Sequence, residues 1–192
     1  MCLGINYISF KIMTDTKFEF IANIDTSLAN ALRRTIISGI SSIVIDTVCI
    51  KENDSNLCDE MLVHRLGLIP LKKTIDDPTT EFKIKLEETG PKRVYSRDIV
   101  FPPGIEAVSP DIIIVNLGPN ETIKLIGTTE EGNAISDNHA KFSVSCGTSY
   151  KKLSDNSFLM RIETTGSIGA KDAFLKAIQI LKEELIMYKK LL

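Results

Sequence analysis

The chain has 192 residues and a formal net charge of -2. Apolar residues make up 43% of the sequence and charged residues 25%, a composition typical of a soluble protein that folds around a core and not of a disordered tail. A charge this close to neutral disfavours direct DNA binding, which usually needs a basic patch or stripe.

The cysteines suggest neither a metal site nor a disulfide framework. The sequence contains four of them, Cys2, Cys49, Cys58 and Cys146, which lie far apart and form no CxxC pair. We therefore expect reduced thiols in an intracellular protein. Polar residues interrupt the N-terminal segment early, and no run approaches the ~20 apolar residues of a membrane span, so no membrane contact is expected.

The first elements in chain order are a β-hairpin and a helix. Residues 7–20 alternate between apolar and polar around a polar turn, which predicts the hairpin. Residues 25–27 offer N-cap candidates, and Gly39 is placed to end the helix. One face of this helix carries Leu28, Ala31, Leu32, Thr35 and Ile36.

A buried strand and a shorter helix follow. The β-branched run at 43–50 predicts a well-covered strand, and a polar turn comes after it. The second helix is expected to begin at Asp59, a cap residue, and to stop at Gly67.

From Lys72 onward, glycine and proline punctuate short apolar runs, and the helical period returns only at the end. A strand at 158–163 and one long helix at 170–192 close the chain. We therefore expect an α+β domain made of residues 1–71 and 156–192, interrupted by a β-rich insert at 72–155. Strands of the insert are predicted at 81–86, 111–116, 122–128 and 141–150.

The long helix carries two adjacent apolar stripes. The first contains Phe174, Ile178, Leu181, Leu185, Tyr188 and Leu192, and the second contains Ala173, Ala177, Ile180, Met187 and Leu191. Together they are wider than docking on one sheet requires, which indicates an interface. Burial of both stripes inside the chain fits the periodicity equally well.

The catalytic patterns that we sought are weak. His139 and Cys146 lie seven positions apart along one predicted strand, which places them on opposite faces, and Asp76-Asp77 and Glu87-Glu88 are isolated pairs. No nucleophile elbow, P-loop or metal-ligand pattern is present. A small hydrolase or transferase that uses His64 or His139 is the enzymatic alternative.

Two motifs resemble one family. Residues 30–34 read NALRR and residues 59–71 read DEMLVHRLGLIPL. Both resemble the RNA polymerase assembly subunits that include the third subunit of eukaryotic polymerase II, its archaeal counterpart and the N-terminal domain of bacterial alpha. They are most similar to the archaeal and eukaryotic branch, and residues 94–98, 139–143 and 164–167 resemble further signatures of this family.

The resemblance implies a non-catalytic scaffold subunit of a multisubunit DNA-directed RNA polymerase. Its dimerisation domain would hold an antiparallel sheet and two long helices, split by the insert. The first and last helices would pack against a smaller subunit of similar fold, and DNA would be met only through the complex. The partner interface would comprise Leu28, Ala31, Leu32, Thr35, Ile36, Phe174, Ile178, Leu181, Leu185 and Tyr188.

The resemblance also implies a contact with the two largest subunits, formed by Asn30, Arg33, Arg34, His64, Arg65, Gly67 and Pro70. The residues themselves allow plainer interpretations. Arg33 and Arg34 fit a solvated helix face, and His64 and Arg65 suit the C-terminal end of a helix dipole. Gly67 would permit a turn and Pro70 would stiffen the exit from it.

The sequence also departs from the family. Many relatives carry a cysteine cluster in the insert that binds zinc or an iron-sulfur cluster, but residues 72–155 contain only Cys146, so we expect no metal or cofactor. Because the sequence stops at the long helix, we expect no counterpart of the DNA-binding domain of bacterial alpha. The many Ile, Lys and Asn residues are typical of an AT-rich genome such as that of a large DNA virus. That source would place the protein in the nucleus, at a cytoplasmic viral transcription site or in a virion. A homodimeric binding module of the same fold is the second alternative.

Overall fold

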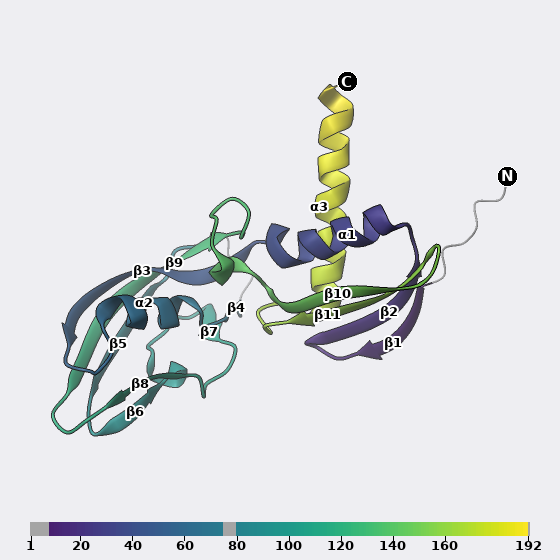
Figure 1. Ribbon diagram of the computed structural model, residues 1–192. Helices are drawn as coiled ribbons and strands as arrows, with labels where there is room; N and C mark the ends of the chain where they lie inside the picture. The colour runs from purple at the N-terminus through teal and green to yellow at the C-terminus, as the bar shows by residue number, and fades with distance from the viewer. Residues whose placement is uncertain (1–7, 75–79, 192) are drawn as a thin grey trace. The chain divides into compact units, whose positions relative to one another are not determined.

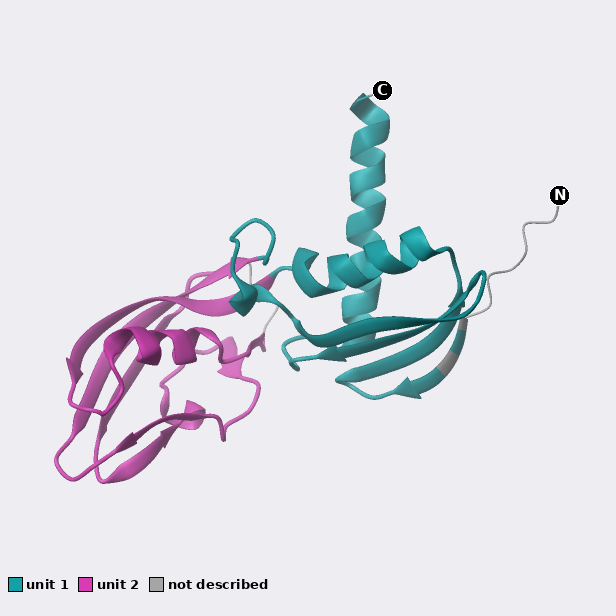
Figure 2. Cartoon of the chain, in the orientation of Figure 1, with its two compact units in different colours: residues 1–41, 133–192 teal, residues 42–132 magenta. Residues whose placement is uncertain are grey.

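The computed structural model describes residues 8–74 and 80–191, and the chain divides into two compact units (Figure 2). Unit 1 is formed by residues 1–41 and 133–192, and unit 2 by residues 42–132. These boundaries differ from the predicted 1–71, 72–155 and 156–192. The reason is strand pairing, because the strand after residue 41 pairs inside the insert, whereas the strand after residue 144 pairs with the returning chain.

Unit 1 is a four-stranded antiparallel sheet with helices on one face (Figure 1). In the order β1-β2-β11-β10, its strands are Ile8–Met13, Lys17–Asn23, Ser157–Thr164 and Ser145–Ser154. The helices are α1 Thr26–Arg34, the π-helical turn η1 Thr35–Gly39, the short 3-10 turn η3 Ala140–Phe142 and α3 Ala170–Leu191.

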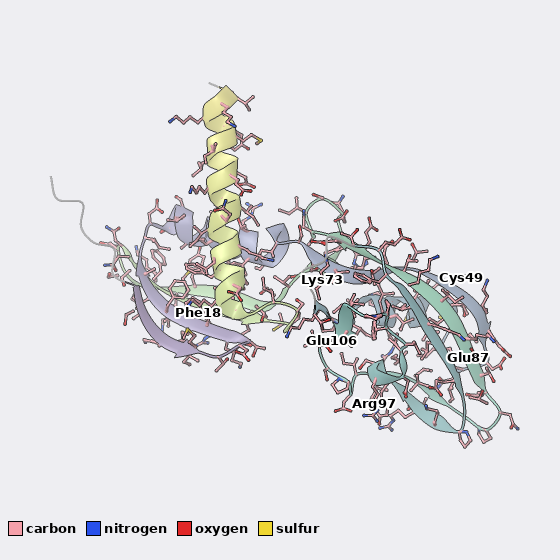
Figure 3. The ribbon with its side chains drawn as sticks, turned by 180° about the vertical axis from the view of Figure 1, so that it is seen from behind. Phe18, Cys49, Lys73, Glu87, Arg97 and Glu106 are labelled. Atoms are coloured by element: carbon pink, nitrogen blue, oxygen red, sulfur yellow. The ribbon has the colours of Figure 1, made fainter. Side chains whose placement is uncertain are left out.

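Three phenylalanines form the centre of the core of unit 1. Strand alternation directs Phe18 and Phe20 of β2 to the helix face, where both are buried. The ring centroid of Phe20 lies 4.7 Å from those of Phe18 and Phe174, and Phe174 comes from α3. Figure 3 labels Phe18 where the sheet meets α3. The first strands and the last helix are thus joined through one aromatic cluster.

The first helix begins as predicted. The carboxylate of Asp25 accepts a hydrogen bond from the backbone N–H of Leu28 at 2.8 Å, which caps one of the free donors of the first turn. The helix then widens into η1 and ends at Gly39. Its buried face carries Ala29, which the sequence pattern missed, together with Leu32 and Ile36.

The long helix α3 is half buried and half exposed. Ala170, Ala173 and Ala177 are fully buried, and these small side chains let the helix lie close to the sheet and to η1. From residue 182 to residue 191 every residue is exposed. The C-terminal half of α3 therefore extends past α1 and stays exposed to solvent (Figure 1).

Unit 2 is built around a three-stranded antiparallel sheet, with helix α2 packed on one side. In the order β3-β9-β5, the strands are Ser42–Asn53, Thr122–Gly132 and Lys83–Thr89, and α2 is Asp59–Gly67. Two small sheets complete it: β4 Leu71–Lys73 with β7 Ile105–Ala107, and β6 Lys92–Tyr95 with β8 Ile113–Leu117, while the 3-10 turn η2 is Ser96–Asp98.

The open face of the large sheet in unit 2 is polar. Glu87 of β5 accepts a hydrogen bond from Lys124 of β9 at 2.7 Å and forms an ion pair with Lys85 (Figure 3). The hydrogen bond from Lys124, followed by that from Lys85, lowers the pKa of Glu87 to about 2. Charged cross-strand pairs of this kind suit a sheet with one solvated face.

The prediction of an α+β chain with mostly antiparallel sheets is confirmed. The strand predicted at 141–150 is wrong in its first part, because residues 140–142 form η3 and β10 begins only at Ser145. The hydroxyl of Ser143 donates to the carbonyl of Ile37 at 2.7 Å, so this segment is tied to η1 before the strand begins.

Replacing Phe20 by alanine should lower the free energy of unfolding by about 3 to 5 kcal/mol, because the buried ring leaves a cavity between β2 and α3. Urea titration followed by circular dichroism measures this loss. Leu191→Ala, at a position 76% exposed, is the control and should change the value by less than about 0.5 kcal/mol. Equal losses in the two variants would contradict the core assignment.

Candidate functional site: an apolar groove on unit 1

Unit 1 carries an apolar groove with a volume of about 550 Å³. Strand β2 and the residue after it contribute Phe20, Ala22, Asn23 and Ile24, and α1 contributes Leu28 and Leu32. Helix α3 contributes Phe174, Ile178, Leu181, Lys182, Leu185, Ile186 and Lys189. The groove thus lies where the sheet, the first helix and the last helix meet.

Most of the predicted partner interface lines this groove, namely Leu28, Leu32, Phe174, Ile178, Leu181 and Leu185. These residues differ in burial. Leu32 and Phe174 are buried and form its base, whereas Leu28, Ile178 and Leu185 are 44%, 42% and 69% exposed. A groove of this kind already has an ordered apolar base and presents accessible side chains above it.

The other predicted interface residues lie elsewhere. Thr35 and Ile36 are buried in unit 1, on the turn η1 that packs against α3, so neither side chain is available to a partner in this structure. The prediction of surface contacts for these two residues needs correction, because the apolar face of the first helix turns inward there. Ala31 is half-buried, and Tyr188 is exposed without lining the groove.

The exposed half of α3 continues the apolar surface beyond the groove. Met187, Tyr188 and Leu191 are all exposed, although this stretch of helix also carries charged residues. The two apolar stripes are therefore divided by length, with the N-terminal half in the core and the C-terminal half in solvent. Leu192 lies outside the described residues. Contiguous exposed apolar side chains of this kind usually mark an interaction surface.

The polar side of α1 carries the predicted arginines. Arg33 donates from Nη2 and Nε to the side-chain oxygen of Asn30, at 2.9 Å and 3.3 Å. This contact orients the Arg33 guanidinium and leaves it further donors. Arg34 is exposed, and its side chain forms no hydrogen bond with another residue in the described ranges 8–74 and 80–191. Both cations are therefore accessible from solvent.

On α2 of unit 2, Arg65 has a structural role that the sequence did not reveal. Its Nε donates to the carbonyl of Ile114 at 2.8 Å, and its Nη2 donates to the carbonyl of Ile113 at 2.6 Å. These bonds hold α2 against β8. The sequence could not show them, because the two carbonyls lie 48 and 49 positions away.

The remaining candidates of unit 2 also divide between surface and framework. His64 is exposed, whereas Gly67 is buried as the last residue of α2. Among the described glycines, left-handed backbone occurs at Gly104 and Gly166. Gly67 therefore does not make the turn by such a conformation, which corrects the predicted reason. Pro70 is half-buried, and its carbonyl accepts a hydrogen bond from the backbone N–H of Val108 at 2.9 Å.

His139 and Cys146, the pair considered as a nucleophilic site, do not lie on one strand as predicted. His139 precedes η3 and its Nδ1 accepts a hydrogen bond from the backbone of Lys141 at 3.0 Å. It does not lie on the strand of Cys146, so the strand-alternation argument was wrong. No group of three metal-binding side chains occurs among the described residues, and Asp76 and Asp77 lie outside them. In the described ranges, no helix has the length and apolar character to span a membrane.

Unit 1 thus combines an α+β domain with an open apolar groove beside its last helix, the kind of surface found in dimerisation domains. Residues 19–185 match the sequence model of the RNA polymerase Rpb3/Rpb11 dimerisation domain. The chain belongs to this family, which confirms the predicted resemblance.

Several relatives support this membership. The DNA-directed RNA polymerase subunit Rpo3 of Methanocaldococcus jannaschii is 36% identical over 171 residues, which cover 88% of this chain and 86% of the relative. The DNA-directed RNA polymerase II subunit rpb3 of Dictyostelium discoideum is 32% identical over 73% of this chain and 55% of its own length. The DNA-directed RNA polymerases I and III subunit RPAC1 of Saccharomyces cerevisiae is 31% identical over 78% of this chain and 57% of its own length. The chain thus matches just over half of the two eukaryotic relatives.

Replacing Arg65 by alanine should lower the free energy of unfolding by about 1 to 3 kcal/mol, because two carbonyls of β8 lose a charged donor. Urea titration measures the change. His64→Ala, one position away on the same helix and exposed, is the control and should stay within about 0.5 kcal/mol of the parent. A silent Arg65 variant would show that its bonds do not hold α2 in place.

Proposed function

We propose that this chain is a non-catalytic assembly subunit of a multisubunit DNA-directed RNA polymerase. It pairs with a smaller subunit of similar fold, and the pair docks the two largest subunits. The observation that carries the proposal is the apolar groove of unit 1 together with the exposed apolar half of α3. Family membership and the polymerase names of the relatives support it.

The physical reason for pairing is the apolar surface that unit 1 leaves in water. Leu185 and Leu191 are 69% and 76% exposed, and Leu28 faces the same groove from α1. Burial of apolar surface is worth roughly 25 cal/mol per Å². A partner helix seated in the groove would recover this free energy, and α3 would become a shared element of two subunits.

The contact with the large subunits is proposed at two separate places. On unit 1 it involves Arg33 and Arg34, whose guanidinium groups can bind carboxylates or carbonyl groups with several donors each. On unit 2 it involves the outer side of α2, where Met61, His64 and Leu68 are exposed. Arg65, Gly67 and Pro70 support this surface from within unit 2.

The proposal assigns the polymerase chemistry and the contact with DNA to other subunits. It also assigns no metal or cofactor to this chain, on the grounds that residues 72–155 contain only Cys146. The chain would act wherever its polymerase transcribes, in a nucleus, at a cytoplasmic viral transcription site or in a virion. The viral source stays a prediction from composition.

Replacing Leu185 by aspartate should reduce recovery of the smaller subunit by at least about tenfold, because a charged carboxylate would replace an apolar side chain that docking buries in the groove. The tagged chain is purified from its native source, and the co-purifying polymerase subunits are identified and quantified by mass spectrometry. Leu175→Asp is the matched control, because Leu175 is an exposed leucine of α3 outside the groove. Full recovery with Leu185→Asp would contradict the proposal.

The double change Arg33→Ala and Arg34→Ala should reduce recovery of the large subunits while the smaller partner is retained, because neither arginine lines the groove. The same purification measures both. Replacing Lys11 and Lys151, two exposed cations of β1 and β10, is the control for lost charge. Unchanged recovery of the large subunits from a folded double variant would remove α1 from their proposed contact.

A further inference from the structure

All charged residues that line the groove of unit 1 are lysines. Lys182 and Lys189 alternate with Ile178 and Leu185 along α3, at the spacing that keeps them on one side of a helix. No aspartate or glutamate is among the residues that line the groove. The charged side chains that line the groove are thus both positive.

Neither lysine is neutralised within its own unit. No hydrogen bond or ion pair joins the side chain of Lys182 or Lys189 to another residue of the part of the chain that the structure describes. On the sheet of the same unit, by contrast, Lys17 lies 3.1 Å from the carboxylate of Glu163. A lysine stem can lie along an apolar wall while its ammonium group stays at the rim, where an arriving partner would meet it.

A chain that binds in the groove therefore comes close to the ammonium groups of Lys182 and Lys189. Burying a charge without a partner is costly, whereas a carboxylate placed beside each ammonium group turns the same contact into a hydrogen-bonded pair. A second copy of this chain offers the wrong charges. In a two-fold symmetric dimer the same patch is contributed by both copies, so a groove-to-groove interface would gather the lysines of both and contain no groove carboxylate.

We propose that the groove takes an amphipathic helix of a different chain, whose apolar ridge is flanked by aspartate or glutamate. Lys182 and Lys189 select this partner over a second copy of the same chain, by attraction in one case and by repulsion in the other. This inference rests on the proposed docking role and adds the charge of the partner to it.

The test uses the full chain and two synthetic helical peptides that share one leucine ridge, flanked in one peptide by glutamate and in the other by lysine. Fluorescence anisotropy measures both dissociation constants. The glutamate-flanked peptide should bind at least about tenfold more tightly at low ionic strength, and added salt should reduce the difference.

Two charge-reversal variants complete the test. Lys182→Glu with Lys189→Glu should reverse the preference between the peptides. Lys171→Glu with Lys176→Glu should preserve it, because these exposed lysines of α3 undergo the same change of charge outside the groove. Circular dichroism verifies that both variants are folded.

Equal affinity for the two peptides, no binding of either, or an unchanged preference in the groove variant would overturn the inference. A dimer of the parent chain that competes with the peptides would also overturn it, if the Lys182→Glu and Lys189→Glu variant forms that dimer with the same dissociation constant. Equal peptide affinities that Leu185→Asp abolishes would leave apolar docking intact and remove charge selection alone. Failure of the polymerase role itself is measured separately, by the recovery of polymerase subunits.

Discussion

The contact between β2 and α3 is the constraint on which unit 1 depends. Phe18 and Phe20 come from the beginning of the chain and Phe174 from its end, and their rings pack within 4.7 to 5.8 Å of one another. This cluster lets a chain that leaves for unit 2 after residue 41 return to complete the same sheet. The buried alanines of α3, Ala170, Ala173 and Ala177, lie only in its first turns. Only this first part of α3 is therefore held in the core.

The groove follows from this arrangement. A sheet of four strands offers a limited apolar face, and α1, η1 and the first half of α3 occupy most of it. The rest of α3 extends beyond the sheet, so Leu185 and its neighbours remain exposed in the described part of unit 1. Residues that would be core in a longer domain thus become a docking surface, and the base of that surface is already ordered by the internal core. Pre-ordering lowers the entropic cost of binding.

The two units show how one residue type can serve two roles. The guanidinium of Arg65, an exposed residue of α2, donates to carbonyls of β8, whereas that of Arg33, a half-buried residue of α1, is only oriented by Asn30. The difference decides which of them a partner can use. Consequently Arg65, although exposed, is already engaged by β8, and the proposed large-subunit contact rests on Arg33 and Arg34 of α1 and on the exposed residues Met61, His64 and Leu68.

The sequence by itself determined the family, the α+β class, a first helix capped within residues 25–27 and a last helix that begins at residue 170, because motifs, caps and periodicity are local signals. Helical spacing also found the groove residues Leu28, Leu32, Phe174, Ile178, Leu181 and Leu185, but not those contributed by β2. Only the tertiary structure decided that β3 pairs inside the insert and β10 outside it, that Thr35 and Ile36 face the core, and that Arg65 is bound. Those outcomes depend on which strand or carbonyl lies opposite, and partners dozens of positions apart leave no periodic trace in the chain.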